Sequence, residues 1–107
     1  MPDSNLELGR FAEPSLLILV SLSDGPKHGY AIMTEVEALS GSPMGPGTLY
    51  GALARLERRG LIEALAPQDR RRPYRLTGVG ATALAGQLEH LRAFARVGLS
   101  RLQGRAQ

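Results

Sequence analysis

Residues 45–62 constrain the fold most, because they combine a start signal, a periodic apolar face and a stop signal for one helix. Pro46 suits the first helical turn, where its missing N–H is not needed, and Gly60 suits the position just past a helix end. Between them, leucines recur after four and then three residues, which places them on one buried stripe. These leucines are Leu49, Leu53 and Leu56. The stretch therefore predicts a single short helix with one face in a core.

The opposite face of this predicted helix is small near its start and basic near its end. Its residues are Gly47, Gly51, Ala54, Arg55 and Arg58. Small residues at a helix N-terminus allow a close approach to phosphates, and arginines supply charge and bidentate hydrogen bonds. The face is therefore typical of a helix that recognises DNA.

Charge is unevenly divided along the 107 residues, although the net charge is only +3. Residues 1–49 contain two basic and six acidic residues, a net charge of −4, whereas residues 50–107 contain eleven arginines and four acidic residues, a net charge of +7. A polyanion would therefore meet the second half of the chain. Arginine accounts for nearly all of the basic residues, and it suits the recognition of phosphate and guanine.

Two further helices are predicted before this stretch. One opens at Pro14 and ends before the Asp-Gly-Pro break at 24–26, and its apolar residues at 16–22 surround it almost completely, which predicts burial on more than one side. The other covers about residues 28–39. A short Gly-containing turn at 41–45 joins it to the recognition helix, which is the arrangement of a helix-turn-helix.

After Gly60 the pattern changes to short strands. An apolar-rich run at 61–65 and a second run at 74–76 flank a proline-bracketed turn at 67–73, which predicts a two-stranded hairpin. A hairpin directly after a recognition helix is a wing. The arginines at its tip are Arg70, Arg71 and Arg72.

A long helix is predicted next, with Thr77 as its N-cap and an end near residue 102. From Leu84 onward the apolar spacing alternates between four and three residues, as in a heptad seam. This seam has no obvious partner within the chain, so the helix is predicted to pair with a second copy. Gly98 and Gly104 predict a shorter or kinked final part. The residues assigned to the dimer contact are Leu84, Leu88, Leu91 and Leu102.

The chain is therefore predicted to be mainly α-helical with a small two-stranded β-hairpin, and to form one domain over residues 1–107. About residues 14–77 would form a winged helix-turn-helix, and about residues 78–103 the dimerisation helix. Apolar residues before the first helix need a cover, either from a partner subunit or from the chain's own domain. They are Leu6, Leu8 and Phe11.

Several function classes are not expected. The chain has no cysteine, and its two histidines, His28 and His90, lie on different predicted elements, so neither a metal site nor a cofactor is expected. The sequence has no nucleophile elbow, Walker loop or dinucleotide-binding fingerprint, which argues against an enzyme. Asp3 and Glu7 replace the positive region of a secretory signal, and the longest apolar run, at 16–22, is too short to span a bilayer. A cytoplasmic protein without membrane contact is therefore expected.

Three motifs, taken in order, resemble the PadR-like family of transcriptional regulators in its short type with a single C-terminal helix. They are His-Gly-Tyr at 28–30, Gly-Thr-Leu-Tyr at 47–50 and Tyr-Arg-Leu-Thr at 74–77, and the resemblance covers about residues 14–90. It implies a winged helix-turn-helix homodimer built on the first and last helices, which binds a palindromic DNA operator. Family members are usually repressors, often released by a small hydrophobic or phenolic effector. The tryptophans that line the drug-binding dimer pore in the multidrug-sensing branch are absent from this chain.

The candidate DNA contacts on the predicted helices have different expected roles. Arg55 is expected to read a base edge, unless it is simply a solvated helix arginine, and Arg58 is expected to contact phosphate or to remain solvated. Thr48 and Tyr50 are expected to offer hydroxyls to phosphate. The alternatives are a capping role for Thr48 and packing of the Tyr50 ring against the preceding helix. Lys27 is expected either to contact phosphate or to be an ordinary surface lysine.

The wing arginines Arg70, Arg71 and Arg72 are expected to contact phosphate or the minor groove, unless they are only a solubilising charge run. His28 and Tyr30 are expected to be structural. A second hypothesis for the whole chain is a winged-helix protein-interaction module that binds no DNA. The arginines of the recognition helix and wing favour DNA, because an interaction module would more naturally place apolar residues there.

Overall fold

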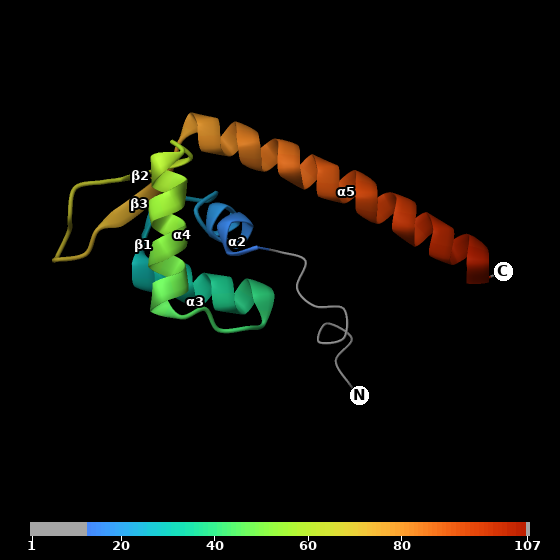
Figure 1. Cartoon of the computed structure of the whole chain (residues 1–107), viewed down its shortest axis with the longest axis horizontal. Helices are drawn as coiled ribbons and strands as arrows, with labels where there is room; N and C mark the ends of the chain where they lie inside the picture. Colours follow the sequence, from blue (N-terminus) through green and yellow to red (C-terminus); the bar gives the residue numbers. More distant parts are fainter. Residues whose placement is uncertain (1–12, 107) are drawn as a thin grey trace.

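Across the residues that it describes, 13–106, the computed structural model contains four helices and three short strands (Figure 1). The prediction of a mainly helical chain with a small β-sheet is confirmed. Leu6, Leu8 and Phe11 lie outside the described residues. The elements are α2 (Pro14–Ser21), β1 (Lys27–His28), α3 (Gly29–Ser40), α4 (Pro46–Arg58), β2 (Ile62–Ala64), β3 (Pro73–Leu76) and α5 (Gly78–Ala106).

Helices α2, α3 and α4 pack against one another around a small apolar core. The predicted buried stripe of α4 is confirmed, since Leu49, Leu53 and Leu56 are at most 2% exposed. Ile18 of α2 and Ile32 of α3 are fully buried in the same cluster. Because one face of α4 is fixed in this core, its opposite face points to solvent.

Helix α4 starts and stops where the sequence predicts. Pro46 occupies its first turn. At the other end Gly60 has a φ of +75°, a left-handed conformation that glycine adopts without steric cost. The Gly60 amide donates to the Glu57 carbonyl and the Leu61 amide to the Leu56 carbonyl, which is the Schellman pattern. This ending turns the chain directly into β2.

The sheet is antiparallel and has the strand order β1-β3-β2. β2 and β3 form the predicted hairpin. A third strand, which the sequence did not indicate, joins it, since Lys27 pairs with Tyr74 and His28 with Pro73. A strand of two residues is too short to show an alternating pattern. The sheet therefore has three strands, one more than the sequence predicts.

The hairpin ends in a tight two-residue turn. Asp69 and Arg70 have φ values of 50° and 66°, and positive φ at both central residues is characteristic of a type I′ turn. The flanking residues Gln68 and Arg71 exchange two backbone hydrogen bonds of 2.7 and 2.8 Å. Residues 62–76 are called the wing below.

Helix α5 begins at a junction held by Thr77. The Thr77 hydroxyl donates to the Gly60 carbonyl at 2.7 Å and accepts from the Gly80 amide at 2.9 Å, as an N-cap does. The 29 residues of α5 run unbroken to Ala106, a length of roughly 44 Å. The expectation of a shorter or kinked helix is wrong, because a single glycine inside a helix costs only about 1 kcal/mol.

The first part of α5 packs on the body of the molecule, and the second part projects away from it (Figure 1). Leu84 is 5% exposed and belongs to the core cluster, where it shares a small hollow with Leu19 and Leu56. The expectation that Leu84 has no partner within the chain is therefore wrong, because α2 and α4 supply one. Beyond Leu91 every described side chain of α5 is exposed.

None of the helices formed by residues 13–106 is both long enough and apolar enough to cross a bilayer.

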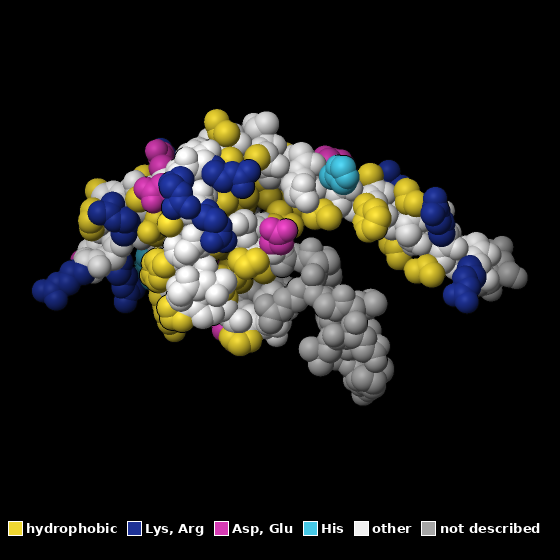
Figure 2. All heavy atoms as spheres, in the orientation of Figure 1, with side chains coloured by type: hydrophobic (Ala, Val, Ile, Leu, Met, Phe, Trp, Pro, Cys, Tyr) yellow, Lys and Arg dark blue, Asp and Glu magenta, His cyan; other side chains and the backbone are white. Residues whose placement is uncertain are grey.

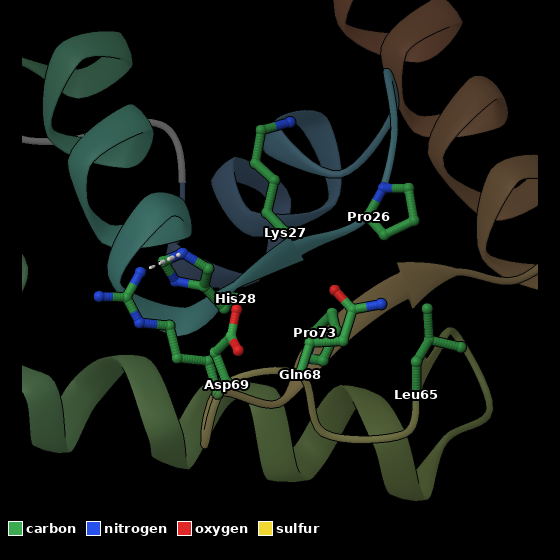
Figure 3. Close-up of a pocket in the computed structure, with 8 residues that line it drawn as sticks. Pro26, Lys27, His28, Leu65, Gln68, Asp69 and Pro73 are labelled. Carbon is green, nitrogen blue, oxygen red and sulfur yellow. Dashed lines mark hydrogen bonds between the residues drawn. The ribbon is translucent and has the colours of Figure 1, made fainter.

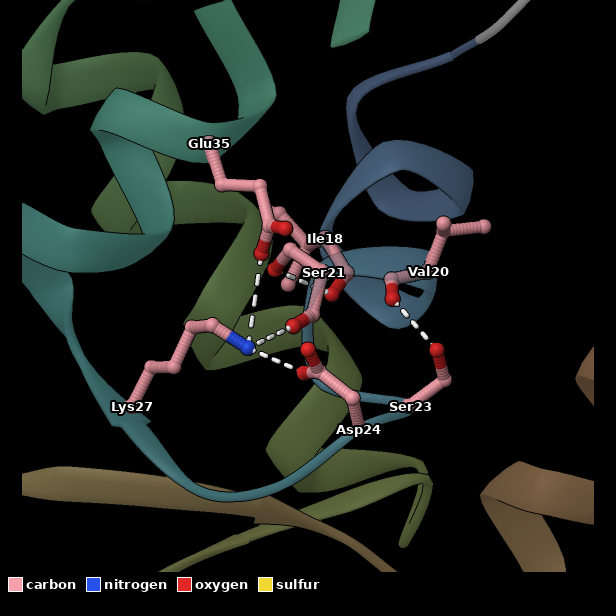
Figure 4. Close-up of polar contacts among 7 residues, drawn as sticks. All are labelled: Ile18, Val20, Ser21, Ser23, Asp24, Lys27 and Glu35. Atoms are coloured by element: carbon pink, nitrogen blue, oxygen red, sulfur yellow. Dashed lines mark hydrogen bonds and ion pairs between the residues drawn. The ribbon is translucent and has the colours of Figure 1, made fainter. Parts of the chain in front are cut away.

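The bend between α2 and β1 is held by Lys27 (Figure 4). Its ammonium group donates to the Ser21 carbonyl and to the Asp24 carboxylate, and the Glu35 carboxylate of α3 lies 3.4 Å away. Burial acts to lower the pKa of Lys27, but its bonds to Asp24 and Glu35 outweigh burial and raise this pKa. The hydrogen bond from Lys27 in turn lowers the pKa of Asp24. One positive charge therefore fastens the end of α2 to α3.

Replacing Lys27 with methionine is expected to destabilise the fold. The Ser21 carbonyl and a buried Glu35 oxygen would both lose the ammonium group, at a cost of about 1–3 kcal/mol in the free energy of unfolding. Asp24→Asn is the matched control, and it should cost less because the Asp24 carboxylate is exposed. Urea denaturation at pH 7, followed by circular dichroism, measures both. Wild-type stability of Lys27→Met would show that this cluster does not hold the bend.

Candidate nucleic-acid interface

The face of α4 that the sequence assigns to DNA is exposed along its whole length. Thr48, Arg55 and Arg58 all lie on it, and Figure 1 shows α4 on the outside of the body with the wing extending to one side. The Arg55 side chain lies back along the helix, with its guanidinium 3.8 Å from the point where a side chain on Gly51 would begin. The guanidinium groups of Arg55 and Arg58 form no hydrogen bond or ion pair with residues 13–106. Both guanidinium groups are therefore available to a ligand.

Basic side chains gather over the C-terminal half of α4 and at the end of the wing on the face shown in Figure 2. Two other arginines of the described chain are paired locally. Arg75 pairs with Glu63 across the hairpin, and Arg92 pairs with Glu89 on α5. The arginines that form no ion pair among residues 13–106 lie at the C-terminal half and end of α4, on the wing, and on the second part of α5.

Tyr50 lies at the edge between the buried and exposed faces of α4. Its hydroxyl contacts the backbone of Gly29 at the start of α3, so closely that a side chain at that position would collide with it. This contact supports the alternative that the ring packs against the preceding helix. The side chain is nevertheless 50% exposed, so a phosphate contact by its hydroxyl stays a prediction.

A hollow of about 340 Å³ lies where α3, α4 and the wing meet. All three tyrosines of the chain line it, namely Tyr30, Tyr50 and Tyr74. Burial, together with the nearby charges of Glu57 and Tyr50, raises the pKa of Tyr74, so its hydroxyl stays protonated at neutral pH. The hollow therefore combines hydroxyl donors with the cationic side chains of the wing. The remaining lining residues are His28, Gly29, Arg70, Arg71 and Arg72.

The three wing arginines have different surroundings. The Arg72 guanidinium donates to the Leu65 carbonyl at 3.1 Å. The Arg71 guanidinium lies 3.1 Å from Nε2 of His28. Both residues line a second hollow of about 680 Å³, in which Figure 3 labels His28. Arg70, at the turn, forms no side-chain hydrogen bond or ion pair with residues 13–106. This division could not be predicted from sequence, because the contact of Arg71 depends on the pairing of β1 with β3 and that of Arg72 on the folded hairpin.

Lys27 is not brought to this interface as a free cation. Its side chain is 21% exposed and its ammonium group is directed at Asp24 and Glu35 (Figure 4). Lys27 is therefore a partly exposed lysine that is held in ion pairs. A phosphate contact would have to replace these partners, so the structure gives Lys27 no support as a DNA contact.

His28 and Tyr30, which the sequence marks only as structural, line the hollow beside the wing. Periodicity could not place them there, because the short strand β1 brings them next to β3. Within residues 13–106, no group of three or more histidine and carboxylate side chains is arranged to hold a metal ion.

Comparison with known families identifies the chain's relatives. The family model described as the transcriptional regulator PadR-like family matches residues 18–86. A protein described as an uncharacterized 37.1 kDa protein in transposon TN4556 of Streptomyces fradiae is 48% identical over 75 residues, which cover 70% of this chain and 22% of that protein. The chain thus spans less than a quarter of that relative's length.

Solved structures with the same fold include three regulators. A PadR family transcription regulator from Clostridium difficile is 27% identical, with a TM-score of 0.77 over 85% of this chain and 99% of that one. A transcriptional regulator from Clostridium thermocellum is 29% identical, with a TM-score of 0.69 over 78% of this chain and 86% of that one. RosR from H. salinarum is 30% identical, with a TM-score of 0.70 over 78% and 76% of the two chains.

The matched family consists of transcriptional regulators, which agrees with the prediction of a non-enzymatic function. Its model covers well over half of the described residues and includes the complete helix-turn-helix and wing. The chain belongs to the PadR-like family of transcriptional regulators.

Proposed function

We propose that this chain is a cytoplasmic transcriptional repressor that binds a palindromic DNA operator as a homodimer. The observation that carries this proposal is the exposed face of α4, which is small near its start and basic near its end, beside a wing tipped with arginine. Such a face suits the major groove, where Arg55 would read a base edge and Arg58 would contact phosphate.

The dimer is proposed to form through α5, together with α2. The seam residues Leu88 and Leu102 are 43% and 60% exposed in one copy of the chain, and Leu91 is only partly buried. Further along, Phe94 is 75% exposed. Hydrophobic side chains gather along the side of α5 that faces the body of the molecule in Figure 2. An exposed apolar surface of this extent on one helix is typical of an interaction site.

A small hydrophobic effector is part of the proposal, because the family resemblance implies one. The described chain offers a partly apolar hollow of about 290 Å³ where α2, α4 and α5 meet, with Glu13, Arg59 and Gln87 also in its lining. Its lining includes Leu16, Leu19, Leu56 and Leu84. A ligand there would lie beside the proposed dimerisation helix and would change the position of α5 relative to α4.

The competing hypothesis is a winged-helix module that binds another protein and no DNA. Such a module would present large apolar side chains on the outer face of α4. That face instead carries glycine, threonine, alanine and arginine, and Tyr50 at its edge is packed on α3. The surface chemistry therefore favours DNA.

The direct test is selection of fragments from genomic DNA by the purified protein. Retained fragments are expected to share a pseudo-palindrome whose half-site centres are about 34–36 Å apart, or a multiple of that, because a two-fold protein presents two copies of α4. Footprinting on the selected fragment locates the half-sites. Retention of no fragment, or of a single asymmetric site, would contradict the proposal.

Arg55→Ala and Arg70→Ala are expected to weaken DNA binding in different ways. Loss of a base contact by Arg55 should cost about 1–3 kcal/mol on the operator and much less on random DNA. Loss of a phosphate contact by Arg70 should weaken both DNAs and flatten the slope of log affinity against log salt by about 0.9. Salt titrations of both DNAs measure this. Arg96→Ala on the exposed part of α5 is the control.

These roles would be wrong if Arg55→Ala weakened operator and random DNA equally. They would also be wrong if Arg70→Ala affected the operator alone.

Leu88→Asp is expected to disrupt the proposed dimer, because it would bury an unpaired charge in the α5 seam. In a single chain Leu88 is 43% exposed, so the isolated fold should tolerate the change. Light scattering should show a dimer for the wild type and a monomer for the variant. Ala93→Asp, about 140° around the helix, is the control and should remain dimeric. A dimeric Leu88→Asp protein would exclude this seam.

A further inference from the structure

His28 connects two parts of the molecule that are far apart in the sequence. It ends β1 and is also the N-cap of α3, where its Nδ1 atom lies 3.4 Å from the Ala31 amide nitrogen. On the other side of the ring, Nε2 lies 3.1 Å from the Arg71 guanidinium, 43 residues further along the chain. Both neighbours of the imidazole are hydrogen-bond donors.

A neutral imidazole cannot satisfy both donors at once. One ring nitrogen carries a proton and donates, and only the other has a lone pair that accepts. The Arg71 guanidinium is permanently charged and has no acceptor, and a backbone amide is likewise only a donor. Either Nε2 accepts from Arg71 and α3 loses its cap, or Nδ1 caps α3 and Arg71 faces an N–H group.

The distances indicate which contact is made. The separation of 3.1 Å at Nε2 is within the usual range for an N–H donor, whereas 3.4 Å at Nδ1 is longer than that range. A bond from a charged donor is also the stronger of the two. These distances favour the tautomer that carries the proton on Nδ1 and directs the lone pair of Nε2 at Arg71.

We infer that the wing and the start of α3 compete for the single lone pair of His28, and that Arg71 is a positioning residue which holds the wing on β1. Arg72 serves the wing in a similar way, since it donates to the Leu65 carbonyl. Arg70 is the one of the three whose guanidinium has no hydrogen-bond partner among residues 13–106, and it is the wing arginine expected to contact DNA. The role of Arg70 in DNA binding rests on the proposed function, whereas the competition for the His28 lone pair does not.

Removal of the Arg71 side chain is expected to have opposite effects on the wing and on the start of α3. In Arg71→Ala, the lone pair of His28 is released from the wing and becomes available to the Ala31 amide. The wing should loosen while the start of α3 becomes better capped. A side chain that only adds general stability would not strengthen one element as it weakens another.

Two measurements on the full chain at about pH 8, where an ordinary imidazole is neutral, test this. Nitrogen-15 NMR of the imidazoles reports which ring nitrogen carries the proton. The His28 proton should lie on Nδ1 in the wild type and shift to Nε2 in Arg71→Ala. His90, on the exposed surface of α5, is an internal reference that should not change.

Amide hydrogen exchange provides the second measurement. In Arg71→Ala, exchange should become roughly 2- to 10-fold faster at residues 68 and 71, and slower by a similar factor at Ala31. Arg70→Ala is the matched control, and it should change neither site. The inference would be overturned if the His28 tautomer did not change, or if amide exchange did not become slower in α3.

The same salt titrations separate this inference from the proposed function. Arg71→Ala should leave the slope of log affinity against log salt unchanged, whereas Arg70→Ala should flatten it by about 0.9. A flattening in Arg71→Ala equal to that in Arg70→Ala would show that Arg71 contacts phosphate and would overturn its positioning role. If the wild type bound no DNA, the proposed function would fail, and the NMR and exchange results would still decide the His28 contact.

Discussion

The packing of one face of α4 against α2 and α3 determines which side chains this protein can present to a ligand. Leu49, Leu53 and Leu56 are buried almost completely, so the helix cannot rotate without exposing them to water. Their burial directs Arg55 and Arg58 outward and leaves no large apolar group between them. The chemistry of the proposed DNA contact is therefore a consequence of the core.

The short pairing of β1 with β3 determines how the wing lies against α3 and α4. It places the start of α3, the edge of α4 and the wing around one hollow, so residues from three sequence motifs meet there. It also brings His28 to Arg71, which divides the arginine triplet into one free and two engaged side chains. A charge count along the chain treats these three arginines as equivalent, and only the tertiary structure distinguishes them.

The features that could be predicted from sequence are those with local causes. The stripe and both ends of α4 depend on residues within a few positions of each other, and so does the Thr77 cap of α5. The features that could not be predicted depend on distant partners. Leu84 has its partners on α2 and α4, and Lys27 is paired with Glu35 of the next helix, so neither environment follows from nearby residues in the chain. Glycines in α5 suggested an earlier end because helix propensity is a weak signal in a long helix.

The junction at Thr77 links the proposed DNA-binding and dimerisation surfaces directly. The Thr77 hydroxyl donates to the Gly60 carbonyl at the end of α4, and its amide donates to the Leu61 carbonyl. About two turns later, Leu84 packs beside Leu56 of the same α4. Two points on α5 are thus fixed relative to one recognition helix. In the proposed homodimer, α5 would therefore set the distance between the two copies of α4, and a ligand that displaced Leu84 would change that distance without touching the DNA-binding face.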